Sequence, residues 1–339
     1  MQIVTLGIDL AKNVFQLHGV DRTGKVVLTK RLRRAHLLRT VAQLPPCLIG
    51  VEACPGAHYW AREFAKFGHD VRLMGAQFVA PYRKGNKNDG NDAEAICEAV
   101  ARPSMRFVPV KSVEQQDLQM LQRIRENVIQ NRTALINQIR GLLAERGIVI
   151  AKGIARARNE LPLILENGEN ELSDLARSLL ATLREELQHI DAHLALIDRR
   201  IVHQFSSNEA CARIAAISGV GVMTATAIVS SVGDARNFKN GRHLAAWLGL
   251  VPRQYASGDR SHMYGITRRG DKRLRSLLIH GARTVVHYAA KKNDRLSQWI
   301  NRLRSKRGTN VAAVALANKF ARWIWAILAK GGTYRSQTI

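Results

Sequence analysis

A chain of 339 residues that is 46% hydrophobic can bury two or three domain cores, and this apolar content excludes wholesale disorder. Its 52 Lys and Arg residues face 27 acidic residues, for a net charge of +25. This excess, spread over the whole length, predicts a polyanionic partner, with nucleic acid favoured over an anionic membrane. The four cysteines have no CxxC spacing, so neither a zinc knuckle nor a disulfide framework is indicated.

Nothing in the sequence predicts export or membrane insertion. The run from Met1 to Asp9 has no basic region before it, as a signal peptide would require. The apolar segment from Val311 to Ala329 contains Asn318, Lys319 and Arg322, which are costly at a bilayer centre. We therefore expect a buried helix there, no membrane partner, and a reducing cytoplasm as the location.

The first hundred residues predict an α/β sheet with helices packed on it. Three β-like runs come first and suggest an antiparallel meander; a helix, a strand, a second helix and a further strand then alternate. The expected elements are strands at Gln2–Asp9, Val14–Val20 and Val26–Leu32, a helix at Arg34–Ala42, a strand at Cys47–Val51, a helix to about Phe67 and a strand at Val71–Met74. The run Cys47–Val51 shows no alternation, which is typical of a strand covered on both faces.

Four acidic residues stand where this fold would deliver them to one place. Asp9 and Glu52 end predicted buried strands, and ligands of open α/β sheets bind at that rim. Asp89 and Asp92 lie at a loop-to-helix junction, where their spacing projects both to one side. Gathered carboxylates repel unless a cation is present, and their hard oxygens suit Mg²⁺.

Each acid also has an ordinary structural explanation. Asn91 is a candidate helix N-cap with Glu94 as its capping-box partner, and Asp92 would then lie favourably in the first helical turn. Asp9 suits a turn at the end of a strand, and Glu52 suits a charge flanking a helix. The case for a metal site rests on all four acids together.

The middle of the chain, from about 111 to 207, predicts two long helices with apolar stripes. Six of eight heptad positions from 118 to 142 are apolar, as are all eight from 176 to 201, and a Gly- and Asn-rich break at 147–170 separates them. This pattern predicts an antiparallel helical hairpin or a dimerising coiled coil, used for assembly. Basic residues on the first stripe are either a solvated face or a nucleic-acid surface: Arg123, Arg125, Arg132 and Arg140.

The segment from Ile217 to Ala225 has the form of a helix-hairpin-helix. Gly219 and Gly221 would let the backbone approach a phosphate, which the amides of the following helix would meet. The alternative is a corner between two helices that needs glycines for packing.

A polar loop and a dense basic run follow. Ser257-Gly258 is expected in an exposed loop after Pro252, and from spacing alone such a pair is usually a turn. The candidate nucleic-acid contacts are Arg253, Arg260, Arg268, Arg269, Lys272 and Arg273. Two helices separated by residues 306–308 end the chain, and Trp323 and Trp325 there fit a core better than stacking on bases.

These motifs together resemble the transposases of the insertion sequence 110 family, relatives of the Piv DNA invertase. GIDLAK with Asp9, VEACPG with Glu52, and KNDGNDAEAI with Asp89 and Asp92 are similar to the D-E-D-D set of their RuvC-like, RNase H-type domain. The segment through GITRRGDKRLR is similar to their C-terminal transposase domain, whose proposed serine nucleophile matches Ser257, with Ser261 as a nearby competitor. The resemblance covers both ends of the chain in the correct order.

The resemblance implies a fold and a function. It divides the chain into a RuvC-like catalytic domain at 1–110, a coiled-coil segment at 111–207 and a mainly α-helical C-terminal domain at 208–339. It implies a bacterial, nucleoid-associated enzyme that binds Mg²⁺ through the four acids and exchanges donor and target DNA strands through a covalent serine-DNA intermediate. A tetramer, or at least a dimer, and a structured bridge RNA encoded by the element are further implications. Two other readings remain: a junction-resolving nuclease that uses water, and a non-catalytic nucleic-acid-binding protein.

Overall fold

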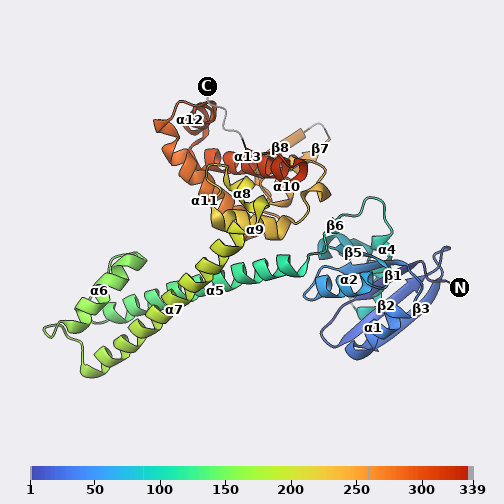
Figure 1. The fold of residues 1–339 in the computed structure, drawn as a ribbon, viewed down its shortest axis with the longest axis horizontal. Coiled ribbons are helices and arrows are strands. Elements are labelled where there is room, and N and C mark those ends of the chain that lie inside the picture. The colour runs from blue at the N-terminus through green and yellow to red at the C-terminus, as the bar shows by residue number, and fades with distance from the viewer. Residues whose placement is uncertain (1, 87, 259, 335–339) are drawn as a thin grey trace. The chain divides into compact units, whose positions relative to one another are not determined.

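The computed structural model describes residues 2–86, 88–258 and 260–334, and the chain divides into two compact units. The first unit covers Met1–Val113 and the second covers Glu114–Ile339 (Figure 1). Nearly all of the helical segment expected at 111–207 therefore belongs to the same unit as the C-terminal segment.

A mixed six-stranded sheet organises the first unit. Its order is β3-β2-β1-β4-β5-β6, built from β1 (Thr5–Asp9), β2 (Val14–Val20), β3 (Val26–Arg33), β4 (Leu48–Glu52), β5 (Asp70–Met74) and β6 (Phe107–Val108). The first three strands form the predicted antiparallel meander, while β1, β4 and β5 run parallel to one another. The short β6, antiparallel to β5, was not predicted, because two residues are too few to show a period.

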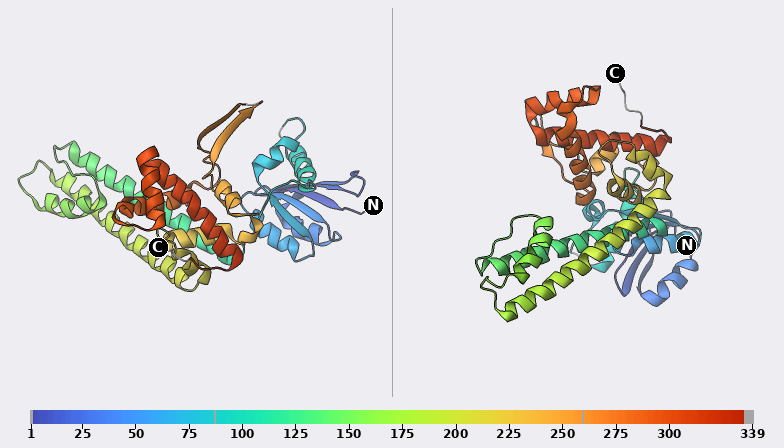
Figure 2. Two further views of the ribbon diagram at one scale, coloured as in Figure 1. Left: turned by 90° about the horizontal axis from the view of Figure 1, so that it is seen from above. Right: turned by 60° about the vertical axis from the view of Figure 1, so that its left-hand side comes forward.

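Helices cover both faces of this sheet (Figure 2). On one face, α1 (Arg34–Ala42) and α2 (Ala57–Ala65) share a core with the strands through Leu37, Trp60 and Phe64. On the other face, α4 (Asp89–Val100) packs with α3 (Ala76–Val79) and the short 3-10 helix η1 (Ala80–Tyr82). Because both faces are covered, β1 and β4 are buried along most of their length, as the unalternating run at 47–51 predicted.

Glycines in two strands let α4 lie close against the sheet. A Cβ on Gly7 of β1 would fall 2.2 Å from the carbonyl oxygen of Ala93, and one on Gly50 of β4 would fall 2.7 Å from Cβ of Val100. A real side chain at either position would push the helix away. The glycines therefore fix which face of β1 and β4 meets α4.

The second unit begins with a long helical hairpin. The helices α5 (Val113–Ala144) and α7 (Asp174–Ser206) pack against each other along their apolar stripes, with buried contacts that include Leu135, Ile139, Leu187 and Ile201. The break between them contains a further helix, α6 (Ile154–Glu166). This helix was not predicted, because Pro162 within it and the Gly and Asn residues around it mask the helical pattern. Each stripe thus finds its partner within the chain.

The two polar positions of the first stripe are ion-paired across the hairpin. Arg125 lies 2.6 Å from the carboxylate of Asp198, and Arg132 lies 3.3 Å from that of Asp191. Burial raises the pKa of Asp191, but hydrogen bonds and charges from Arg158 and Arg132 outweigh it and leave the pKa below its usual value. These two arginines therefore link α5 to α7 through ion pairs within the hairpin.

The rest of the second unit is mainly helical around one large core. Its elements are α8 (Glu209–Ala215), α9 (Val222–Val232), η2 (Ala235–Asn237), α10 (Gly241–Trp247), β7 (Pro252–Ser257), β8 (Arg260–Ile266), α11 (Lys272–Tyr288), η3 (Ala289–Lys291), α12 (Arg295–Arg307) and α13 (Thr309–Lys330). By length and composition α13 passes the test for a membrane span. Leu316, Phe320 and Ile324 nevertheless bury one side of it in the core, as the sequence predicted.

Candidate active site and nucleic-acid interface

Two of the four predicted acids lie side by side at the carboxyl ends of neighbouring strands. Asp9 is the last residue of β1 and Glu52 the last residue of β4. The strands are parallel with Ile8 paired to Val51, so the two acids follow at the next position of the register. Both are half-buried. The sequence-based expectation that these two strand ends meet is confirmed.

Both acids stand on the face of the sheet that α4 covers. Side chains two residues apart in a strand share a face, so Asp9 follows the orientation of Gly7, and Glu52 follows that of Gly50. A Cβ at either glycine would point into α4. The helix runs antiparallel to β1, because Ala93 and Cys97 both lie against Gly7 and the later of them, Cys97, also donates its thiol back to the carbonyl of Thr5. The N-terminus of α4 consequently lies toward Asp9.

That N-terminus carries the other two acids. The helix begins at Asp89, and its N-cap is Asn88, whose side chain accepts a 2.8 Å hydrogen bond from the amide of Asn91. The alternative that made Asn91 the cap was wrong, because the chain turns into the helix three residues earlier. Asp89 is exposed and Asp92 half-buried, both in the first turn, where the helix dipole favours negative charge. Lys87, the first residue of the motif, lies outside the described residues.

Charges around these acids are already partly compensated. Arg83 lies 3.2 Å from a carboxylate oxygen of Asp92, and Lys84 lies 3.0 Å from Glu94. Burial raises the pKa of the Cys54 thiol, and the negative charges of Glu52 and Asp9 raise it further. Both strand-end carboxylates are therefore close enough to Cys54 for their charges to act on the same thiol.

The four acids offer the oxygen donors that a divalent cation such as Mg²⁺ prefers. They come from one end of two adjacent strands and the helix that covers them, so the donor set fits such an ion. Across residues 2–86, 88–258 and 260–334, however, no three His, Cys, Asp or Glu side chains are close enough to hold one. Carboxylates that gather on one face repel one another when no cation lies between them.

The sheet adds two polar residues that sequence reasoning missed. On β2, Gln16 is paired in register with Asp9, and His18 is paired with Gly7, so both share the face of the acids. The pKa of His18 is lowered, chiefly by burial and also by the positive charge of Lys84, while the negative charge of Glu94 opposes the change. The alternation of β2 was the available signal, since its even-numbered positions all face α4.

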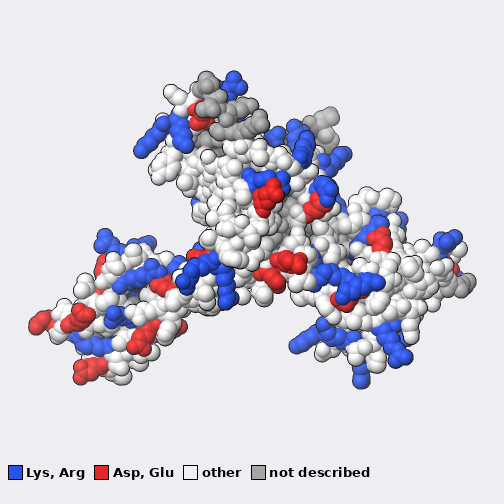
Figure 3. Space-filling view, in the orientation of Figure 1, with Lys and Arg blue, Asp and Glu red and all other residues white. Residues whose placement is uncertain are grey.

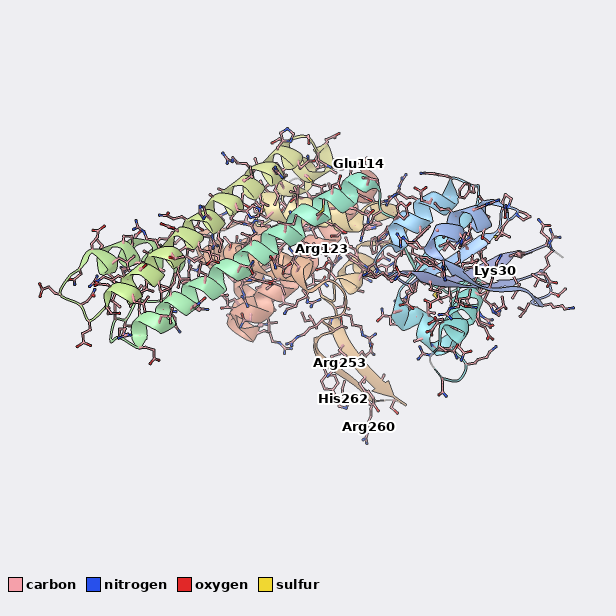
Figure 4. The ribbon with its side chains drawn as sticks, turned by 90° about the horizontal axis from the view of Figure 1, so that it is seen from below. Lys30, Glu114, Arg123, Arg253, Arg260 and His262 are labelled. Carbon is pink, nitrogen blue, oxygen red and sulfur yellow. The ribbon has the colours of Figure 1, made fainter. Side chains whose placement is uncertain are left out.

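Ser257 lies on a two-stranded arm of the second unit. It is the last residue of β7, where a loop was expected, and it is paired with Arg260 of β8. The strands form because the successive residues from Gln254 to Ser257 pair with those from Met263 back to Arg260. Every residue of β7 is exposed. Figure 4 shows Arg253, Arg260 and His262 along this arm. The competitor Ser261 accepts a 3.0 Å hydrogen bond from Gln254, and no partner for the Ser257 hydroxyl occurs among the described residues.

The base of the arm is clasped to the core. A Cβ on Gly249 would fall 2.1 Å from the carbonyl oxygen of Arg269, and one on Gly270 would fall 2.0 Å from that of Trp247, so these backbones touch. The buried guanidinium of Arg275 donates 3.1 Å hydrogen bonds to the carbonyls of Leu248 and Arg269. This clasp fixes where the arm leaves the domain while its tip stays in solvent.

The two hairpin glycines have different surroundings. Gly219 has φ +93° and packs so closely on α11 that a Cβ would fall 2.7 Å from the carbonyl oxygen of Gly281. Gly221 is exposed at the entrance to α9, where a Cβ would meet no described atom within 4 Å. Packing between helices therefore explains Gly219, as the structural alternative required, whereas Gly221 leaves the backbone open to a ligand.

The predicted basic contacts also differ in accessibility. Arg253, Arg260, Arg268, Arg269 and Lys272 are exposed. Arg273 is half-buried and engaged with α5, through a hydrogen bond to Gln122 and an ion pair of 3.8 Å with Glu126. Burial lowers its pKa, with the nearby Arg125 acting in the same direction and Glu126 opposing. Figure 3 shows Lys and Arg distributed over the visible face of both units.

Two family models match this chain. One is described as "Transposase IS116/IS110/IS902 family" and matches residues 211–297. The other represents DEDD transposases of the IS110 type, is described as "Transposase", and matches residues 6–147. The first match contains the β7–β8 arm, and the second contains all four predicted acids.

Similar proteins match over nearly their full length. A "Probable family 20 transposase" of Pseudomonas aeruginosa is 48% identical over 99% of each chain. The "Transposase for insertion sequence element IS1111A" of Coxiella burnetii is 46% identical, over 98% of this chain and 92% of its own. The "Transposase for insertion sequence element IS1328" of Yersinia enterocolitica is 38% identical over 98% of both.

Proposed function

Because this chain belongs to the IS110/IS116/IS902 family of transposases, we propose that it cuts and exchanges DNA strands with a metal site in its first unit and a serine nucleophile in its second. A transposase is an enzyme of phosphoryl transfer on DNA. The observation that carries the proposed metal site is the placement of Asp9, Glu52, Asp89 and Asp92 at one end of β1, β4 and α4.

The first unit serves as the RNase H-type catalytic domain. Its four carboxylates would hold divalent metal, with Mg²⁺ the ion proposed, which when bound stabilises negative charge on the phosphoryl oxygens. The chain's own contribution is to keep these carboxylates on a rigid sheet and helix. Gln16 and His18 lie on the same face of β2, where they are suited to contact the DNA backbone beside Asp9.

Ser257 is the proposed nucleophile. Its hydroxyl oxygen attacks phosphorus, the new bond to phosphorus forms as the bond to the 3′ oxygen breaks, and the freed DNA end takes up a proton as a 3′ hydroxyl. The phosphoserine linkage retains the energy of the broken bond for rejoining to another DNA end. Exposure at the tip of a clasped arm suits a residue that must reach DNA. Arg260, paired with Ser257 across the arm, would meet the charge of the phosphate.

The four acids and Ser257 belong to different units of the chain. An oligomer, a dimer or tetramer, would allow one subunit to supply the acids and another the serine. The net charge of +25 suits simultaneous binding of donor DNA, target DNA and a structured bridge RNA that selects them by base pairing. Gly221 and the exposed arginines of the arm are the proposed contacts to these strands.

The decisive experiment looks for the covalent intermediate. With Mg²⁺, the RNA of the element and donor and target DNA, the protein should form a DNA adduct that survives denaturation and is lost on protease digestion. Ser257→Ala should abolish the adduct, and Ser261→Ala should retain it. Asp9→Asn should remove adduct and strand exchange together.

The outcomes separate the competing functions. Strand exchange that persists in Ser257→Ala would refute the serine nucleophile and favour a nuclease that uses water and the four acids. Strand chemistry that persists in Asp9→Asn would refute the metal site. Binding with no strand chemistry under any of these conditions would leave a non-catalytic nucleic-acid-binding protein.

A further inference from the structure

A hollow of about 460 Å³ lies between α10 and α13, and its lining residues include none of the β7–β8 arm and none of the four acids. Its charged lining residues are all positive: Arg242 of α10, and Lys319 and Arg322 of α13. The tryptophans Trp323 and Trp325 complete the wall. The two helices lie side by side in Figure 1.

Three cationic side chains line this hollow. In the part of the chain that the structure describes, none of the three cations forms an ion pair with an acidic side chain. Lys319 is half-buried, and its ammonium lies 4.0 Å from the centre of the Trp299 ring, which offsets part of its desolvation. Burial lowers the pKa of Lys319, and the charge of Arg322 lowers it further. An anion between these groups would relieve the repulsion.

The hollow is built into the packing of the domain. A Cβ on Gly241 would fall 2.8 Å from Cα of Arg322, so the glycine permits the contact that brings Arg242 and Arg322 to one site. The indole nitrogen of Trp325 donates hydrogen bonds to the carbonyls of Ala235 and Phe238, at 3.1 and 2.9 Å, which fixes that wall. The cations and the aromatic wall thus come from rigid elements of the core.

We propose that this hollow is a binding site for one unpaired nucleotide of a nucleic-acid strand. The phosphate lies between Arg242, Lys319 and Arg322, and the sugar and base rest on the tryptophan wall. Arginine is suited to phosphate because its planar fork donates several hydrogen bonds, and tryptophan accepts any base by its face. The volume admits a group of nucleotide size. A duplex keeps the faces of its bases stacked on one another and presents only their edges in the grooves, so a single strand is the favoured occupant of a site that stacks on a base.

The test uses fluorescence anisotropy of the full-length protein with a fluorescein-labelled ten-nucleotide oligothymidylate. Arg322→Glu should weaken binding more than tenfold. In Arg322→Ala, the slope of the logarithm of affinity against the logarithm of salt concentration should fall by about 0.7, the value for one lost phosphate contact on a single strand. Arg199→Glu and Arg199→Ala on α7 carry the same charge changes at another exposed arginine and should shift affinity less than threefold, with no change in slope.

A second comparison isolates the base. Trp323→Leu should weaken binding of the oligothymidylate about fivefold or more but leave an abasic strand of the same length unaffected. Equal losses for the Arg322 and Arg199 variants would overturn the site, since general electrostatics would then explain both. A ten-base-pair duplex that binds as tightly as the single strand, with the same loss in Arg322→Glu, would overturn the unpaired nucleotide. The binding assay contains no Mg²⁺, so its outcome is separate from that of the adduct experiment.

Discussion

At the scale of single residues, Arg83 is the ion-pair partner of Asp92, one of the four candidate metal ligands. Its guanidinium lies 3.2 Å from Asp92, and both side chains are partly exposed. Such a pair contributes about 0.2–1 kcal/mol. A metal ion that takes Asp92 as a ligand must compete with Arg83, which then becomes available to a DNA phosphate.

We expect Arg83→Ala to raise the affinity for Mg²⁺ by up to about fivefold, because the competing ion pair is lost. Titration calorimetry of the DNA-free protein measures this directly. Lys84→Ala is the matched control, because it removes one positive charge from the next residue but frees Glu94 instead of Asp92. A lower Mg²⁺ affinity in Arg83→Ala, with no change in Lys84→Ala, would mean that Arg83 orients Asp92 for the ion.

At the scale of elements, the approach of α4 to the sheet positions all four acids. Gly7 and Gly50 allow the helix to rest on the backbone of β1 and β4, and the acids two residues later inherit the same face. The clasp at Gly249 and Gly270 does the corresponding work for the arm that carries Ser257. In both places glycines set the position of the larger residues that are candidates for function.

We therefore expect Gly7→Ala to destabilise the protein by about 1–3 kcal/mol, since its methyl group would meet the carbonyl of Ala93. Denaturant unfolding followed by far-ultraviolet circular dichroism measures the change. Gly141→Ala is the contrast: this exposed glycine of α5 has nothing near a Cβ, so the change should stabilise its helix by up to about 1 kcal/mol. Equal effects of the two substitutions would contradict a specific contact between α4 and β1.

At the scale of the whole molecule, the two units have separate cores. The first unit encloses two clusters, one on each face of its sheet, and all their buried members lie before residue 101. The second unit encloses the large C-terminal core and the two clusters of the helical hairpin. Charge is the property that both units share, because Lys and Arg occur throughout the chain.

A fragment of residues 1–113 should therefore fold alone. We expect cooperative thermal unfolding and well-dispersed amide resonances, because sheet and covering helices supply its cores from within. The fragment should also bind Mg²⁺, and Asp9→Asn should abolish that binding while leaving the melting transition in place. A fragment that collapses without dispersed resonances would show that the second unit is needed for the fold of the first.

The sequence by itself determined the local structure and the chemistry on offer. Alternation and apolar runs are local signals, so they predicted β1 to β5, the two long helices of the hairpin and the end helices, and they placed Asp9 and Glu52 at strand ends. The motifs also identified the family. Local patterns were insufficient to predict β6, α6 and the β7–β8 arm. The two strands of the arm pair only with each other, and β7 has no buried face that would give an alternating pattern.

Only the tertiary structure decided which groups meet. Register set Gln16 beside Asp9, helix direction brought the start of α4 toward the same strand end, and close packing assigned Gly219 to α11. Tertiary contacts also pair Arg125 and Arg132 of α5 with aspartates of α7. They bring three cationic side chains together between α10 and α13. These contacts join residues far apart in the chain, and their energies depend on distance and burial, which no local pattern of residues contains.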